Sequence, residues 1–166
     1  MHRAILSAVT LLAGAAFSAN AQTPAAPMVI YSDGLASGWQ NWSWGATVTL
    51  QVPAGGVQPI KVDAGTPWSA LDLHHDAFST AGYSKLTFYI NGGVDGGQTL
   101  TVHIKTQDGK SPDATYTFQP KVKSWNLVEV PLADIGAANA TISDVYIQGG
   151  ATDYKAYYVD KIQLEP

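Results

Sequence analysis

The sequence predicts an all-β protein folded as an antiparallel jelly-roll β-sandwich. Apolar and polar residues alternate with a period of two in several segments, most clearly at residues 86–91 and 100–105. Such alternation is typical of a strand with one buried face. Glycine-rich turn sequences separate the segments, as at residues 91–93 and 95–97. Short strands between frequent turns favour a sandwich over an α/β fold, with a closed barrel as the alternative.

About ten strands are expected in a single domain at residues 28–166, without an internal repeat. In the clearest strands, apolar residues occupy every second position throughout, so they share one parity. The other strands are shorter apolar runs between turns. They lie at residues 28–32, 46–52, 60–63, 69–74, 86–91, 100–105, 115–119, 126–130, 145–148 and 156–164.

Composition excludes several classes of protein. With 46% hydrophobic and 13% charged residues in a chain of 166, the protein can bury a core of its own. A formal charge of −4 argues against a nucleic-acid binder or a basic membrane contact. The chain has no cysteine, which excludes disulfides, zinc-cysteine sites and thiol catalysis.

The first 21 residues have the form of a secretory signal peptide. Arg3 precedes an apolar run at residues 4–17, and Ala19-Asn20-Ala21 is a cleavage sequence of the A-x-A type. The run is too short to span a bilayer, so we expect no membrane insertion. Cleavage near Ala21 would leave a short spacer at residues 22–27 and an exported protein, extracellular or periplasmic.

The last predicted strand changes parity. Tyr157 and Val159 share one parity, and Ile162 and Leu164 have the other. A β-bulge near Asp160 would allow both pairs to face the core. Because terminal strands of a sandwich commonly lie side by side, Asp160 and Asp33 are predicted to bind a structural calcium ion, whereas two ordinary turn aspartates are the alternative.

Signatures of catalysis are missing. The chain contains no G-x-S-x-G, phosphate loop or H-E-x-x-H sequence. Its two glutamates, Glu129 and Glu165, are not placed like a glycosidase pair. Adjacent His74 and His75 would point to opposite faces of a strand, which argues against a shared transition-metal ion.

An aromatic set instead predicts carbohydrate binding. Sugar rings stack on flat aromatic side chains and hydrogen-bond to amide, carboxylate and imidazole groups beside them. Trp42, Trp44 and Trp68 are the predicted platforms, although Trp42 and Trp44 could equally pack on the core. Trp125 is expected to be structural. The predicted polar ligand-binding residues are Asp72, His74, Tyr89, Asn91 and Gln148.

These residues lie in a succession of segments that resembles the galactose-binding-like β-sandwich carbohydrate-binding modules of secreted proteins. The segments are residues 29–35, 38–44, 68–71, 83–88, 91–93, 96–98, 125–132, 147–149 and 157–162. The resemblance implies non-catalytic glycan binding, often beside a glycoside hydrolase. It also implies a structural calcium ion near the chain ends, at Asp160, although Lys161 stands where the similar motif is frequently acidic.

We therefore expect a secreted, lectin-like module that binds an uncharged polysaccharide, with a glycoside hydrolase as a possible partner. Two other functions stay open: a hydrolase or lyase that acts on polysaccharide, for which Asp72 and His74 are the residues to test, and a structural matrix or envelope protein without a glycan site. Burial of all five tryptophans would favour the structural protein.

Overall fold

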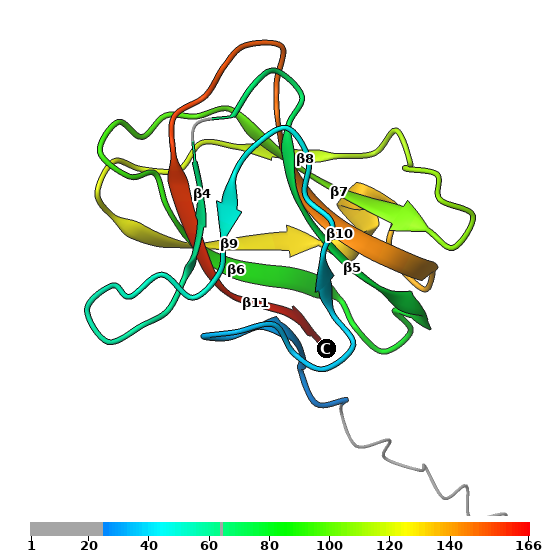
Figure 1. Cartoon of the computed structure of the whole chain (residues 1–166). Helices are drawn as coiled ribbons and strands as arrows, with labels where there is room; N and C mark the ends of the chain where they lie inside the picture. The colour runs from blue at the N-terminus through cyan, green and yellow to red at the C-terminus, as the bar shows by residue number, and fades with distance from the viewer. Residues whose placement is uncertain (1–24, 64) are drawn as a thin grey trace, which may run out of the picture.

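A computed structural model describes residues 25–63 and 65–166 as a jelly-roll β-sandwich of two antiparallel sheets (Figure 1). The first sheet has the order β3-β4-β11-β6-β9, with β1 also paired to β11, and the second has the order β2-β5-β10-β7-β8. The strands of the first sheet are β1 (Met28–Tyr31), β3 (Val48–Thr49), β4 (Ile60–Val62), β6 (Lys85–Asn91), β9 (Trp125–Pro131) and β11 (Tyr157–Glu165). Those of the second sheet are β2 (Gln40–Asn41), β5 (Ala70–Ser79), β7 (Leu100–Thr106), β8 (Tyr116–Phe118) and β10 (Thr141–Gly149).

The core lies between the sheets and is built by the predicted alternation. In β7 the inward side chains are Leu100, Val102 and Ile104, all buried. Opposite them, β6 contributes Leu86, Phe88 and Ile90. Two sheets that each bury one face in this way leave their other faces free, and the outward residues are available for other roles.

Several strand boundaries differ from the predicted ones. The expected strand at residues 46–52 is reduced to β3, because Gln51 has a φ of 58° and breaks the extended backbone. β5 is longer than expected and continues to Ser79. Two elements were not predicted: the two-residue strand β2 and a 3₁₀ turn, η1 (Leu132–Ile135), that follows β9.

The predicted β-bulge in the last strand is confirmed. The pairing of β11 with β6 shifts register between Asp160 and Gln163, and Lys161 has a φ of 51°. The bulge lets Val159 and Ile162 both lie buried in the core. Asp160 is therefore held at an irregular point of the central strand of its sheet.

The first and last strands of the chain lie side by side, as expected. Met28 in β1 pairs with Leu164 in β11, and Figure 1 shows the C-terminus beside the first strand. The predicted signal peptide, residues 1–21, lies outside the described residues. Within residues 25–63 and 65–166, no helix is long and apolar enough to cross a bilayer.

Two adjacent glycines at the end of β10 provide a test of the core packing. A Cβ atom on Gly149 would lie 2.3 Å from two ring carbons of buried Tyr154, whereas one on Gly150 would meet nothing within 4 Å. Overpacking of this kind costs about 1–3 kcal/mol. Gly149→Ala should lower the free energy of unfolding by that amount, measured by chemical denaturation.

Gly150→Ala is the matched control and should change the free energy of unfolding by less than about 0.5 kcal/mol. Equal stability of the two variants would contradict the described position of the Tyr154 ring.

Candidate functional site

The outer face of the second sheet carries a group of aromatic and charged side chains. Three outward rows cross β5, β10 and β7 in register, because β10 pairs with both neighbours and the side chains of each strand alternate between faces. The rows are His74–Asp144–Lys105, Asp72–Tyr146–His103 and Ala70–Gln148–Thr101. We refer to this surface, together with Trp42, Trp44 and Trp68, as the aromatic face.

The segment at residues 40–44 delivers two tryptophans to this face. It runs antiparallel along the free edge of β5: Gln40 pairs with His74, and the Trp44 amide donates to the Ala70 carbonyl at 3.1 Å. The Trp42 amide donates to the carbonyl of Asp72 at 2.9 Å. Alternation along this extended segment places Trp42 and Trp44 on the same side.

Trp42 and Trp44 are held by contacts of their rings, and all three tryptophans remain accessible. Trp42 stacks on the imidazole of His74, with ring centroids 3.5 Å apart and an interplanar angle of 11°. The indole nitrogen of Trp44 donates to the Trp68 carbonyl at 2.8 Å, and the Gln148 amide donates to the same oxygen at 2.9 Å. The exposed fractions of Trp42, Trp44 and Trp68 are 52%, 37% and 58%.

Lys105 links the charged groups beneath these rings. Its ammonium donates to a carboxylate oxygen of Asp72 at 2.5 Å and to one of Asp144 at 3.2 Å. The same ammonium lies 5.2 Å from the ring centroid of Trp44 and 5.3 Å from that of Tyr146. Lys105 is therefore held both by ion pairs and by cation–π contacts.

The two carboxylates beside Lys105 have opposite pKa shifts. Burial raises the pKa of Asp72 to about 6, although the Lys105 ammonium opposes this shift. Burial also acts to raise the pKa of Asp144, but hydrogen bonding from Ser143 and the charge of Lys105 outweigh it, so this pKa lies below its usual value. The second oxygen of Asp72 is buried without a hydrogen-bond partner among the described residues, which accounts for the difference.

The imidazoles of the face complete the set of polar groups. His103 stacks on Tyr146 with centroids 4.7 Å apart, and burial lowers the pKa of His103, which favours the neutral ring at pH 7. His74 lies 3.2 Å from an oxygen of Asp144 through its Nδ1 atom. Proton donation from Nδ1 to this carboxylate would leave Nε2 of His74 as a hydrogen-bond acceptor.

Five of the eight predicted ligand-binding residues have their side chains on the aromatic face: Trp42, Trp44, Asp72, His74 and Gln148. Trp68 contributes its backbone carbonyl, which accepts from Trp44 and Gln148. Tyr89 and Asn91 do not join them, because their strand β6 belongs to the other sheet. The prediction that Trp125 is structural was wrong: it lies on β9 at the edge of the first sheet and is 40% exposed. Trp39 is the buried tryptophan, packed against Phe78 and His75.

The sequence reasoning missed two charged residues at the centre of this face, Lys105 and Asp144. Lys105 is an outward position in a strand with clear alternation, and that parity is the signal that could have identified it. Asp144 is an outward position only if alternation is counted from Val145 and Ile147. The register of β10 with β7 shifts between Ile142 and Asp144, so alternation counted from the start of β10 assigns Asp144 to the wrong face.

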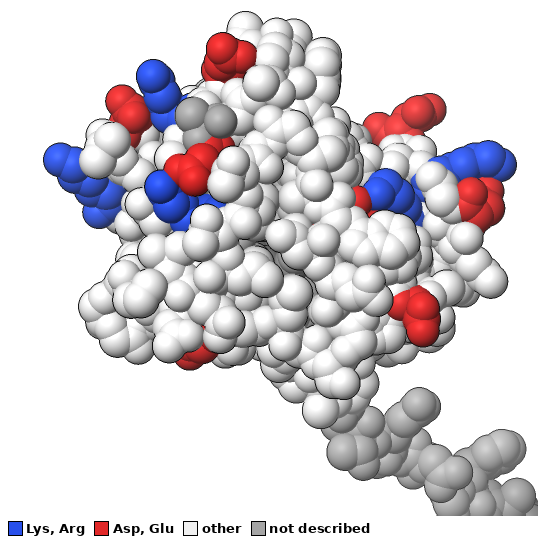
Figure 2. All heavy atoms as spheres, in the orientation of Figure 1, with Lys and Arg blue, Asp and Glu red and all other residues white. Residues whose placement is uncertain are grey.

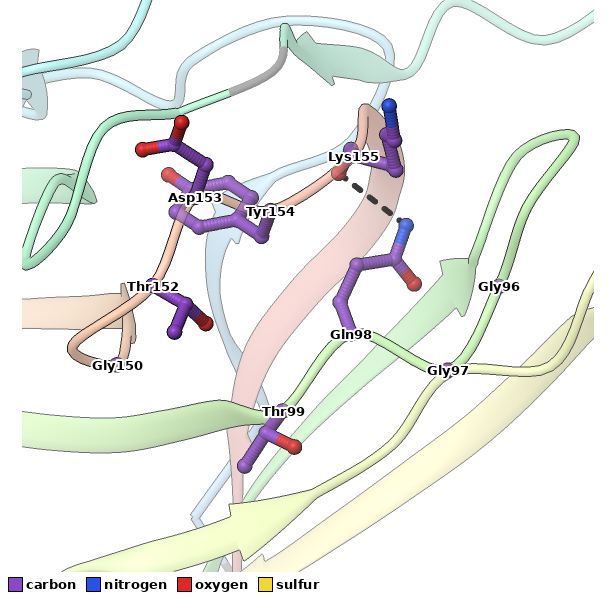
Figure 3. Close-up of a pocket in the computed structure, with 9 residues that line it drawn as sticks. All are labelled: Gly96, Gly97, Gln98, Thr99, Gly150, Thr152, Asp153, Tyr154 and Lys155. Carbon is purple, nitrogen blue, oxygen red and sulfur yellow. Dashed lines mark hydrogen bonds between the residues drawn. The ribbon is translucent and has the colours of Figure 1, made fainter.

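The loops at one end of the sandwich enclose a hollow of about 250 Å³, shown in Figure 3. The amide nitrogen of Gln98 lies within hydrogen-bond distance of the carbonyls of Gly92, Lys155 and Ala156, at 2.9, 3.2 and 3.0 Å. Gln98 thus connects the loop before β7 to the loop before β11. The hollow is lined by Gly96, Gly97, Gln98, Thr99, Gly150, Thr152, Asp153, Tyr154 and Lys155.

The predicted calcium ligands lie near the paired chain ends. One oxygen of Asp33 accepts the Gln58 amide at 2.7 Å, and one oxygen of Asp160 accepts the Lys161 amide at 2.8 Å. The second oxygen of each carboxylate forms no hydrogen bond among the described residues. The described part of the chain, residues 25–63 and 65–166, contains no cluster of three or more His, Asp or Glu side chains that could hold a metal ion.

Charge is sparse over most of the protein surface. Figure 2 shows one side of the molecule as a largely uncharged surface with lysines and acidic residues intermixed near its edges. Such a surface attracts neither polyanions nor polycations strongly.

The raised pKa of Asp72 predicts a pH dependence of stability. Its pKa of about 6 exceeds the unfolded value of 3.8, so the folded state binds the proton more tightly. The contribution of Asp72 to the free energy of unfolding should therefore increase as pH falls from about 6 to about 4. Asp144 acts in the opposite direction at lower pH, because its pKa is depressed. Denaturant titrations from pH 7 to pH 4 measure the combined slope.

Asp72→Asn removes the titrating carboxyl group, so the pH dependence of its unfolding free energy is compared with that of the wild type. The difference in unfolding free energy between the wild type and Asp72→Asn should change in favour of the wild type as pH falls through this window. A difference independent of pH would contradict the described burial of Asp72.

Comparison with known proteins places the fold among carbohydrate-binding modules. A family 29 module from Piromyces equi is 14% identical, with a TM-score of 0.62 over 84% of this chain and 89% of that one. A family 29 variant solved with cellulohexaose is also 14% identical, with a TM-score of 0.65 over 84% of this chain and 89% of that one. The family 11 module of a Clostridium thermocellum cellulosomal cellulase is 16% identical, with a TM-score of 0.57 over 86% of this chain and 96% of that one. No protein-family model and no curated protein matches the sequence. The chain therefore has the β-sandwich fold of these carbohydrate-binding modules, as predicted.

Proposed function

We propose that the protein binds an uncharged polysaccharide on the aromatic face and performs no chemistry on it. The observation that carries the proposal is the arrangement of Trp42 and Trp44 beside the outward polar groups of β5 and β10. Trp42 stacks on His74 through one ring face and is still 52% exposed, so a ring face remains for a sugar. The fold supports the same function, because family 29 modules solved with cellulohexaose share it.

The charges of the aromatic face favour a neutral ligand. Lys105, its one cationic lysine or arginine, is bound to two carboxylates, so Asp72 and Asp144 compensate its charge. An anionic polysaccharide would have to displace Asp72 or Asp144 from Lys105. A neutral polysaccharide needs only hydroxyl groups that hydrogen-bond to His74 and Gln148, so binding should depend weakly on salt concentration.

Hydrolysis of a glycan is the second candidate function. The pKa of Asp72 is raised and that of Asp144 is lowered, and such divergence is a property of acid and base pairs in glycosidases. However, both carboxylates are bound to one ammonium, and Asp72 is almost completely buried. This arrangement supports a fixed polar network beneath a ligand better than proton transfer to one.

A structural protein without a glycan site is less well supported. That function would be favoured by burial of all five tryptophans, and four of the five are at least 37% exposed. The exposed rings are concentrated on a sheet face that is otherwise well ordered by hydrogen bonds. Exposure of such costly apolar surface is better explained by a ligand.

Replacement of Trp44 tests the binding proposal. In affinity gels that contain hydroxyethylcellulose, glucomannan or xylan, Trp44→Ala should lose at least about tenfold in affinity for the retained polysaccharide, which is about 1.4 kcal/mol or more. The melting temperature should fall less than that of Trp39→Ala, because Trp44 is 37% exposed whereas Trp39 is buried.

Trp39→Ala is the matched control, since Trp39 is buried and belongs to the core. It should lower stability by about 3–5 kcal/mol. Equal retention of the wild type and Trp44→Ala on a gel that does retain the wild type would contradict the proposed role of the aromatic face. The same polysaccharides, assayed for new reducing ends, should show no turnover. Turnover abolished by Asp72→Asn or His74→Ala would support the hydrolase instead.

A structural calcium ion at Asp33 and Asp160 stays a prediction. Each carboxylate has one oxygen outside the described hydrogen bonds, and calcium prefers oxygen ligands, but it takes six to eight of them. Millimolar calcium should raise the melting temperature of the wild type relative to EDTA and should not raise that of Asp160→Asn. An unchanged wild-type melt would contradict the calcium prediction and leave the glycan proposal intact.

Secretion and a glycoside hydrolase partner belong to the same proposal. The signal-peptide pattern at residues 1–21 supports export, and the Clostridium thermocellum module with this fold is part of a cellulase. Amino-terminal sequencing of the protein from the culture medium or periplasm should find a terminus near Gln22.

A further inference from the structure

The outer face of the first sheet contains a hollow that the aromatic face does not include. It has a volume of about 130 Å³ and is lined by Tyr89, Trp125, Asp160, Lys161 and Val57. Tyr89 and Trp125 are 41% and 40% exposed, although both stand on regular strands. The residues come from three neighbouring strands and one loop, so the hollow is assembled by the fold and not by one flexible segment.

The strand register explains why the two rings and the carboxylate lie together. Asp160 in β11 pairs with Tyr89 in β6, and the next outward residue of β6, Asn91, pairs with Trp125 in β9. Side chains two residues apart on a strand share a face, so Asp160, Tyr89, Asn91 and Trp125 all point outward from the sheet.

Asp160 forms the polar base of this hollow. It is 4% exposed, yet it lines the hollow, and one of its oxygens accepts the Lys161 amide at 2.8 Å. Among the described residues its other oxygen forms no hydrogen bond. This oxygen is not sealed from solvent, so a ligand hydroxyl in the hollow can reach it, and a carboxylate is a strong hydrogen-bond acceptor.

We propose that this hollow is a second sugar-binding site, which holds one ring of an uncharged glycan between Trp125 and Tyr89 with a hydroxyl donating to Asp160. The inference rests on the proposed function of the protein as a polysaccharide binder. The aromatic rings supply the apolar surface that sugar C–H faces need. Lys161 and Asp160, which both line the hollow, carry opposite formal charges, so the site has no net charge and favours a neutral ligand.

A sugar fits this surface better than a protein partner does. A docking protein would use a broad apolar area, and the neighbouring outward residue Leu127 would contribute to it. The hollow itself is small, and a buried carboxylate lies at its base. That arrangement suits a ligand with hydroxyl groups and one stacked ring.

The two sites face in opposite directions. The aromatic face and the hollow lie on the outer faces of different sheets, and the core of the sandwich separates them (Figure 1). One short oligosaccharide therefore cannot fill both sites, and two sites on one chain can hold two polysaccharide strands together. A lone module of this design would cross-link its polymer.

Tryptophan indole signals in NMR spectra can test the second site separately from the first. The full mature chain is titrated with cellohexaose, mannohexaose and xylohexaose, and the five indole N–H signals are assigned by substitution. In Trp42→Ala/Trp44→Ala, the aromatic face is disabled. At least one of the three oligosaccharides should still shift the Trp125 signal, and calorimetry should find two sites per wild-type chain and one per double variant.

Asp160→Asn and Trp125→Ala should each weaken this remaining binding at least fivefold, measured by calorimetry in EDTA. Leu127→Ala is the matched control, because Leu127 is exposed on the same strand as Trp125 but does not line the hollow. It should leave the affinity unchanged.

The outcomes separate this inference from the proposed function. A Trp125 signal that stays fixed in the double variant, while the wild type binds sugar through Trp42 and Trp44, would overturn the second site alone. Loss of affinity in Leu127→Ala equal to that in Trp125→Ala would assign the surface to a broad protein contact. Binding at the hollow that occurs only with calcium would reassign Asp160 to the ion. No shift at any indole in the wild type would overturn both proposals.

Discussion

The structure depends on the burial of one face of each sheet against the other. Because side chains alternate along a strand, the inward apolar residues determine which residues point outward. A shift of a strand's register by one residue would move each of its side chains to the opposite face of the sheet. Leu100, Val102 and Ile104 in β7 thus fix Lys105 on the outer face. The same constraint requires a bulge wherever the apolar parity changes, and β11 has one at Asp160.

The outward residues of the sheets are not restricted to apolar types by the core, and on the second sheet they form a polar network. On the second sheet, Lys105 connects Asp72 and Asp144 and lies over the rings of Trp44 and Tyr146. The network holds charged groups rigidly beneath exposed aromatic rings, so the polar atoms are already in position before a ligand arrives. Preorganisation of this kind reduces the entropy that binding would otherwise lose. The polar network would therefore favour the proposed binding, even though its ion pairs compensate one another.

Local patterns in the sequence predicted the sandwich, most of its strands and the bulge at Asp160, since these features depend on alternation alone. Asp72, His74 and Gln148 share one face for the same reason, whereas Trp42 and Trp44 reach that face because residues 40–44 pair with β5. Pairing between strands was less predictable, because a strand's own sequence does not specify its sheet. Tyr89 and Asn91 were grouped with Asp72 on their outward parity, but β6 and β5 belong to different sheets. Trp125 was misassigned although the parity that it shares with Glu129, opposite to Val128 and Val130, marks it as outward.

The most direct test of the central claim is a residue-by-residue NMR titration of the protein with a glucan or mannan hexaose that it binds. The account predicts that the largest shifts occur at outward residues of the second sheet, His74, Lys105 and Tyr146 among them, and at the indoles of Trp42 and Trp44. Sugar binding that left these five residues unshifted and moved only the end loops around Gln98 would contradict it.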